Sequence, residues 1–226
     1  MIRKYQDIDE VLGMFVSTDS LRPVLLKPWR VGRFVFAGNG HIAIKLPAVM
    51  VKQKYPTIAE LEDPTCKLKK VPDVQRVIDD ATLLESPIVV TVQDIRKTLL
   101  KLDTEPVYED CEGCKGTGKI HCVFCGHDYD CEDCDGSGKS NVAIGKDFSI
   151  NDNIKIGNNY FFPNVVFALL WVAKISGYDE VVLKSNEVRK MVLFDVGEIQ
   201  VLIAPKHVDD DYYDFQFYEI EIREMV

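Results

Sequence analysis

The sequence lacks a long apolar run and lacks an excess of positive charge. Its most apolar stretch, from Tyr160 to Ile175, is interrupted by Pro163, Asn164 and Lys174, so it is too short to cross a bilayer. Lys and Arg total 27 against 36 Asp and Glu, which gives a net charge of -9. Broad, nonspecific attraction to nucleic acid requires a basic surface. The composition therefore predicts no membrane role. If the chain binds DNA, it must do so through a local basic surface.

Signals for export and for common enzyme chemistry are also missing. The N-terminal segment MIRKYQDIDE carries charges where a signal peptide needs an apolar run, so we expect a cytoplasmic protein with reduced cysteines. There is no P-loop, dinucleotide fingerprint or H-E-x-x-H helix. We interpret His41 as a turn residue whose ring makes a local hydrogen bond and Cys66 as a small, half-buried residue rather than a nucleophile. We predict that the chain is not an enzyme.

Cysteine, in contrast, is concentrated in one short stretch. Six of the seven cysteines stand in three C-x2-C pairs, which are Cys111 and Cys114, Cys122 and Cys125, and Cys131 and Cys134. The first and last pairs continue into the same glycines, so the unit C-x2-C-x-G-x-G occurs twice. Two such turns supply the four thiolates of a structural zinc site, and the glycines let amide groups turn toward the sulfurs. A disulfide framework is the alternative, but it needs an oxidising compartment.

The pairing of these cysteines is open at this point. If the two glycine-bearing repeats face each other, they form one all-cysteine site. The middle pair then needs other ligands, and the segment HCVFCGH places His121 and His127 beside it, which allows a mixed site of two cysteines and two histidines. The first repeat can instead pair with the middle pair and leave the third pair without a partner. We predict one zinc ion and allow for a second.

The stretch resembles the cysteine-rich zinc domain of the DnaJ co-chaperones, whose signature is the repeated C-x2-C-x-G-x-G unit. The resemblance covers residues 108–140 and implies an inserted zinc-binding β-hairpin module. The family has four repeats, whereas this chain has two complete ones and one without its glycine tail. The His-Pro-Asp signature of a J domain is absent from the chain. The resemblance thus implies the zinc fold, and the acidic character of the stretch favours a protein partner over DNA.

Outside this stretch the patterns alternate between helix and strand. Apolar spacing predicts a helix that starts at residue 8 and ends near residues 17–20, and the turn GNG predicts a hairpin between strands 31–38 and 41–48. Further predictions, in chain order, are a short helix at 73–81, a strand at 86–92, a helix at 92–102, a pair of strands at 143–150 and 153–157, a helix at 162–176, strands at 181–185, 190–196 and 199–206, and a C-terminal strand. A helix followed by an antiparallel meander thus occurs at both ends, which predicts an α+β domain of two similar halves.

Two segments resemble DNA sliding clamps. They are LRPVLLKPWRVGRFVFAGNGHIAIKLP, which includes the turn at Gly40 and His41, and the helix and strands from Asn159 to Pro205. The resemblance implies one DNA-clamp-like domain of two pseudo-repeated halves, formed by residues 1–107 and 141–226 together, with residues 108–140 inserted. It also implies a DNA-associated replication or processivity accessory, and a ring would require a homo-oligomer.

A clamp presents basic helices to DNA phosphates. The middle helix carries Arg96, Lys97 and Lys101 and is our candidate for a nucleic-acid-binding surface. The alternative is that these charges form an ordinary solvated helix face.

Three functional hypotheses follow from the sequence. The first is a clamp-like accessory protein that docks other replication proteins through its zinc insertion. The second is a chaperone-like or protein-interaction module that holds extended peptide on the zinc hairpin. The third is an enzyme whose cleft the sequence does not reveal. We rank them in this order, and the first two both require a protein partner.

Overall fold

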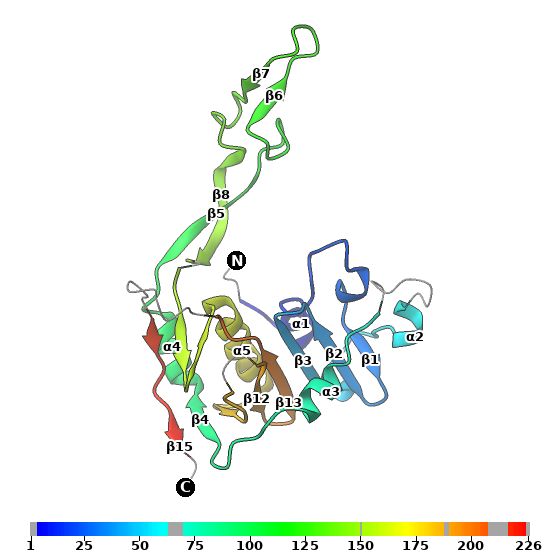
Figure 1. The fold of residues 1–226 in the computed structure, drawn as a ribbon, viewed down its shortest axis with the longest axis vertical. Helices are drawn as coiled ribbons and strands as arrows, with labels where there is room; N and C mark the ends of the chain where they lie inside the picture. Colours follow the sequence, from blue (N-terminus) through cyan, green and yellow to red (C-terminus); the bar gives the residue numbers. More distant parts are fainter. Residues whose placement is uncertain (1–3, 63–69, 150, 188–189, 208–216, 225–226) are drawn as a thin grey trace. The chain divides into compact units, whose positions relative to one another are not determined.

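The computed structural model describes the chain except residues 1–3, 63–69, 150, 188–189, 208–216 and 225–226 (Figure 1). The chain divides into two compact units. One contains Asp103–Ser149 and is called the cysteine module below. The other contains Lys4–Leu102 and Ile150–Val226 and is called the α+β unit. Cys66 and the acidic segment 208–216 lie outside the described residues.

The α+β unit is built on an eight-stranded sheet with the order β1-β2-β3-β13-β12-β11-β4-β15. Every pairing in it is antiparallel. The strands are β1 (Trp29–Val31), β2 (Phe34–Gly38), β3 (Ile42–Pro47), β4 (Ile88–Thr91), β11 (Glu180–Leu183), β12 (Val192–Val196), β13 (Ile199–Ile203) and β15 (Arg223–Glu224). Two meanders, β1 to β3 and β11 to β13, meet where β3 pairs with β13. The predicted α+β class with antiparallel strands is confirmed.

Side chains that alternate along these strands give the sheet two apolar faces. One face contributes Phe36, Ala43, Leu193 and Leu202 to a buried cluster that also contains Val74 and Ile78 of helix α3 (Val74–Asp79). The other face carries Ile44, Val201 and Phe194, which face one another across β3, β13 and β12 and are fully buried. Both faces are therefore covered, as the apolar runs of these strands require.

Helix α5 (Pro163–Ser176) is the longest helix of the unit and packs against both α1 (Ile8–Leu12) and α4 (Val92–Leu99). Pro163 stands at its start, where no backbone donor is needed, and Gly177 ends it in the left-handed conformation with φ 76°. The first helix ends at Leu12 rather than near residue 17. Turns continue the chain to Phe15, which is still fully buried. Shorter helices are α2 (Ile58–Leu61) and the 3-10 turns η1 (Pro23–Leu25) and η2 (Ala48–Met50).

The two strands predicted at 143–150 and 153–157 both form, but their described residues do not pair with each other. Instead β9 (Ile154–Ile156) pairs with β10 (Asn159–Phe161) and with β14 (Tyr218–Glu219). The earlier segment belongs to β8 (Lys139–Phe148), which pairs with β5 (Thr104–Asp110) in the cysteine module. The two strands that flank the cysteine pairs, β5 and β8, pair with each other. The sequence does not predict this pairing, because β5 shows no apolar alternation.

The cysteine module consists of the β5–β8 ladder, the two glycine-bearing cysteine turns and the hairpin of β6 (Lys119–His121) and β7 (Asp128–Asp130). Figure 1 shows the loop between β6 and β7 at the end of the module opposite to the β5–β8 ladder. Its compact unit is wider than residues 108–140 because the ladder belongs to it. None of the described helices is long and apolar enough to cross a membrane.

Candidate metal centre

Four cysteine side chains converge in the cysteine module. The turn between β5 and β6 carries Cys111 and Cys114, and the turn between β7 and β8 carries Cys131 and Cys134. The four sulfur atoms all lie within 4.8 Å of one another. None of the four residues is more than 7% exposed, and all are free thiols. Of the alternatives that the sequence leaves open, the structure brings the first repeat to the last one.

The distances between the sulfurs fit a tetrahedral metal ion. Cys111 Sγ lies 3.8 Å from Cys131 Sγ, and Cys114 Sγ lies 3.8 Å from Cys134 Sγ. A zinc–thiolate bond is about 2.3 Å long, so two sulfurs of a regular tetrahedron around zinc lie about 3.8 Å apart. The four buried cysteines are therefore close enough to hold a metal ion, and they offer sulfur alone.

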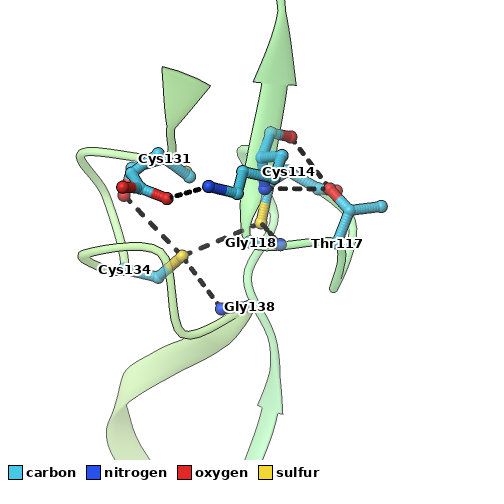
Figure 2. Close-up of polar contacts among 8 residues, drawn as sticks. Cys114, Thr117, Gly118, Cys131, Cys134 and Gly138 are labelled. Atoms are coloured by element: carbon cyan, nitrogen blue, oxygen red, sulfur yellow. Dashed lines mark hydrogen bonds and ion pairs between the residues drawn. The ribbon is translucent and has the colours of Figure 1, made fainter. Parts of the chain in front are cut away.

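The two repeats are arranged with an approximate two-fold symmetry. The amide of Gly118 donates to Cys114 Sγ at 3.2 Å, and the amide of Gly138 donates to Cys134 Sγ at 3.3 Å (Figure 2). The first cysteine of each repeat donates its own amide to the glycine carbonyl of the other repeat, Cys111 to Gly138 and Cys131 to Gly118, both at 2.9 Å. Each repeat thus completes the other, and the amides supply outer-shell donors to the sulfurs.

The last glycine of each repeat allows this close crossing. Gly118 and Gly138 have φ angles of 72° and 75°, which only glycine adopts readily. A Cβ atom on Gly118 would run into the carbonyl oxygen of Gly136, and one on Gly138 would run into the carbonyl oxygen of Gly116. The repeated G-x-G pattern is therefore a packing requirement of two backbones that meet at the cluster.

The thiols of the cluster differ in how readily they ionise. Burial works against the charged form of Cys114, but hydrogen bonds from the Gly118 amide and from neighbouring thiols outweigh it and lower its pKa to about 7. Burial raises the pKa of Cys131 to about 12, because the closed cluster solvates negative charge poorly. Cys114 therefore ionises readily and Cys131 does not. A divalent cation offsets this repulsion, so the electrostatics suit a metal ion.

Matched ion pairs flank the cluster on the surface. Lys119 Nζ lies 2.5 Å from Asp130 Oδ1, and Lys139 Nζ lies 2.6 Å from Asp110 Oδ1. All four side chains are more than half exposed, so each pair contributes little to stability. The two pairs occupy equivalent positions in the two repeats, as the cysteines do.

The middle cysteine pair does not assemble the predicted mixed site. Cys122 is half-buried and Cys125 is exposed. The ring of His121 contacts Asp128, with Nδ1 2.9 Å from Oδ1. Among the described residues, the four buried cysteines form the only group of three or more metal-binding side chains. Cys122, Cys125 and His127 lie near one another, whereas His121 contacts Asp128, so these four residues stay predicted ligands of a second site.

Cys125 has an acidic thiol. Its Sγ lies 3.2 Å from the hydroxyl of Tyr129. This hydroxyl, the amide and ring of His127 and the thiol of Cys122 together lower the pKa of Cys125 to about 6. An exposed thiol with these neighbours is mostly thiolate at neutral pH and is available to a metal ion. The sequence could not indicate this, because the contact with Tyr129 depends on the hairpin register.

The predicted DNA surface lies on α4 and just after it. Arg96, Lys97 and Lys101 are exposed, and Lys97 Nζ lies 3.4 Å from Asp94 Oδ1. A cavity of about 610 Å³ adjoins α4 and is lined by residues of both charges, including Asp94, Asp179, Glu180, Glu221, Arg96, Lys97 and Arg223. The surface around these three residues is therefore not uniformly basic, and DNA binding by them stays a prediction.

His41 lies in the turn between β2 and β3. Its amide donates to the side chain of Asn39 at 2.9 Å, and its carbonyl accepts from Ala204 at 2.7 Å. Both bonds use the backbone of His41. The contacts are those of a turn residue.

Comparison with protein-family models finds no match to the chain. Curated protein sequences give no match either. Among the solved structures that resemble it are bacterial sliding clamps. The DNA polymerase III beta subunit of Thermotoga maritima has a TM-score of 0.47 and 10% identity over 92% of this chain and 68% of that one. The clamp of Bartonella birtlesii bound to griselimycin has a TM-score of 0.45, 10% identity and the same coverage. The clamp of Pseudomonas aeruginosa has a TM-score of 0.44 and 14% identity over 88% and 64%.

At these scores the likeness to sliding clamps is loose. The DnaJ-type resemblance of residues 108–140 stays a prediction from the sequence, since no family model matches.

Proposed function

We propose that this protein is a non-enzymatic adaptor whose cysteine module binds one structural zinc ion through Cys111, Cys114, Cys131 and Cys134 and presents a hairpin to a protein partner. The observation that carries the zinc proposal is the pair of 3.8 Å sulfur distances inside a closed, buried cluster. Four thiolates in a tetrahedral arrangement select zinc among abundant divalent ions.

The character of the site supports a structural role. Catalytic zinc keeps one position open for water or substrate, whereas four protein ligands close the shell. Here all four ligands are cysteines, and amide donors from Gly118 and Gly138 already approach two of the sulfurs. Zinc at this site would fix the two repeats against each other and hold the β6–β7 hairpin in place. It would activate no substrate.

The exposed end of the hairpin supports the docking role. Val123 is 82% exposed and Phe124 is 96% exposed, and the strands β6 and β7 are exposed along their whole length. Large apolar side chains gathered on a rigid support are typical of interaction surfaces. The hairpin therefore offers two apolar side chains that nothing in the described chain covers.

Metal analysis tests the zinc proposal. Protein purified without chelator is expected to contain zinc, and a Cys122→Ser, Cys125→Ser double variant isolates the four-cysteine cluster and should retain one ion per chain. Adding Cys111→Ser and Cys131→Ser to that variant should remove this ion. Zinc-free protein, or an ion that persists without Cys111 and Cys131, would overturn the assignment.

Paired surface variants test the docking role. Phe124→Ser should abolish capture of the partner from extracts, while Val49→Ser, which changes a side chain that is 92% exposed on the α+β unit, should leave capture unchanged. Equal capture by both variants would contradict docking through the hairpin. If the role is chaperone-like, wild-type protein should also suppress aggregation of an unfolded client, and Phe124→Ser should lose this effect.

Association with DNA as a replication accessory is a second candidate. The exposed Arg96, Lys97 and Lys101 favour it, whereas acidic residues line the adjoining cavity. Light scattering with and without circular duplex DNA tests it. A ring-sized or DNA-dependent assembly that disappears in an Arg96→Ala, Lys97→Ala, Lys101→Ala variant would support the role. A protein whose molar mass does not change when DNA is added would contradict this role.

A further inference from the structure

The middle C-x2-C turn has the backbone of a metal-binding half-site. In all three turns the residue after the second cysteine has a positive φ: 54° at Lys115, 71° at Gly126 and 49° at Asp135. In all three the amide of the first cysteine donates across to a carbonyl at 2.9 Å, as Cys122 does to His127. The turn at the hairpin end, residues 122–125, is called the tip turn below. It is built like each half of the four-cysteine cluster.

The opposite half is missing from the described chain. In the buried cluster, two such turns face each other and supply two sulfurs each. The tip turn has Cys125 exposed and Cys122 half-buried, and no second cysteine turn faces it. Zinc sites of this type need four ligands. The tip turn supplies two of them.

The hairpin register limits what the same chain can add. His121 faces Asp128, Ile120 faces Tyr129, and Cys122 bonds to His127. Since side chains alternate between the two faces of a hairpin, Cys122, His127 and Tyr129 lie on one face and His121 lies on the other. The contact of the Tyr129 hydroxyl with Cys125 agrees with this assignment. His121 therefore points away from the tip sulfurs and binds Asp128 instead, so one chain offers at most three ligands.

We propose that the tip turns of two copies of this chain join to bind one zinc ion, with Cys122 and Cys125 of each copy as its four ligands. The chain itself shows the required geometry, because its two outer turns already meet across an approximate two-fold axis. A second copy supplies an identical turn, and a two-fold contact between identical surfaces is self-complementary. The exposed Val123 and Phe124 lie between the two cysteines and would be covered in this contact, so the second copy is then the protein partner that the hairpin receives. The inference rests on the zinc chemistry of the proposed function.

The test is the molar mass and zinc content of the full chain. Wild-type protein with zinc should have twice the 25.7 kDa mass of one chain and about 1.5 zinc ions per chain, that is, one in each buried cluster and one shared. The Cys122→Ser, Cys125→Ser variant should be a monomer with about one zinc ion per chain. A titration with chelator should dissociate the wild-type dimer, because its shared site is exposed, before it strips the buried cluster.

His127→Ala separates the shared site from a site within one chain. The variant should keep the wild-type mass and zinc content, because the imidazole is not a ligand. A monomer with about two zinc ions per chain, of which His127→Ala loses one, would overturn the proposal in favour of a site of Cys122, Cys125 and His127. A wild-type monomer with one ion, or a dimer that survives loss of both tip cysteines, would also overturn it.

If the buried cluster does not bind zinc, the zinc content of the variants is different. If zinc binds only at the tip, the Cys122→Ser, Cys125→Ser variant contains no zinc. That result would refute the proposed function and leave the shared site standing.

Discussion

Replacement of Gly118 by Ala tests the geometry of the cysteine cluster directly. Gly118 has a φ of 72°, and a Cβ atom on it would meet the carbonyl oxygen of Gly136. Its backbone also makes two bonds at the cluster, since its amide donates to Cys114 Sγ and its carbonyl accepts from Cys131. The substitution should therefore force the two repeats apart at the point where they cross.

The expected loss has two parts. A left-handed conformation costs a residue with a side chain about 1–2 kcal/mol. Separation of the repeats weakens two hydrogen bonds, each worth about 1 kcal/mol. The sum is about 3–4 kcal/mol, and since about 1.4 kcal/mol corresponds to a factor of ten in affinity, zinc binding by the cluster should weaken roughly 100- to 1,000-fold.

A matched control removes the contribution of the backbone angle. Gly126 has nearly the same φ, 71°, but a Cβ atom there meets nothing within 4 Å. Gly126→Ala should therefore weaken zinc binding by the cluster by at most about 30-fold, which is the upper cost of the angle alone. Both substitutions are made in the Cys122→Ser, Cys125→Ser background so that the buried cluster is the only cysteine site under test.

Competition with a chromophoric zinc chelator measures the two affinities on one scale. A Gly118→Ala variant that binds zinc as tightly as Gly126→Ala would refute the reasoning, because the crossing of the two repeats would then not be required for metal binding. Gly138→Ala should reproduce the loss, since its Cβ atom would meet the carbonyl oxygen of Gly116 in the same way.

Three further predictions concern the rest of the chain. Removal of zinc by chelator should abolish hydrogen-exchange protection in residues 108–140 and leave protection in β12 and β13 unchanged, and loss throughout the chain would contradict separate folding. Thr91→Ala should lower the free energy of unfolding by about 1 kcal/mol in urea, because the Thr91 hydroxyl accepts from the Asp94 amide at the start of α4. The Thr91 hydroxyl and Lys97 hold the pKa of Asp94 below its ordinary value of 3.8. The resulting stability is therefore present above that pH and lost as the pH falls below it, and Asp94→Asn should reduce the steepness of acid unfolding.

Local signals in the sequence predicted the elements of the α+β unit well. The turn GNG, the proline at the start of α5 and the apolar spacing of its residues each act over a few positions. The pairing of β3 with β13 joins Lys45 to Gln200, which are 155 positions apart. No local pattern specifies such a contact, because its register depends on packing of the whole sheet.

The strand β5 was missed for a different reason. Its sequence TEPVYED is almost wholly exposed along the ladder, so it has no buried face and no apolar alternation to detect. The sequence therefore predicts no strand there and no partner for the strand at 143–150. The same gap left the pairing of the cysteine repeats open. All three C-x2-C turns have similar local sequences, and the β5–β8 ladder helps bring the first and last turns together.

The composition of the cysteine module explains why metal binding and folding should be one process there. Of its described apolar residues, only the four cysteines and Phe148 are buried. A unit with so little apolar burial cannot offset the loss of conformational entropy by the hydrophobic effect alone. The ion pairs of Lys119 with Asp130 and of Lys139 with Asp110 are exposed and contribute little. If zinc binds the cluster as proposed, its binding free energy is a term large enough to fold the module. The cysteine cluster would then take the place of a hydrophobic core, and the hairpin that carries Phe124 would form only where the cluster is closed.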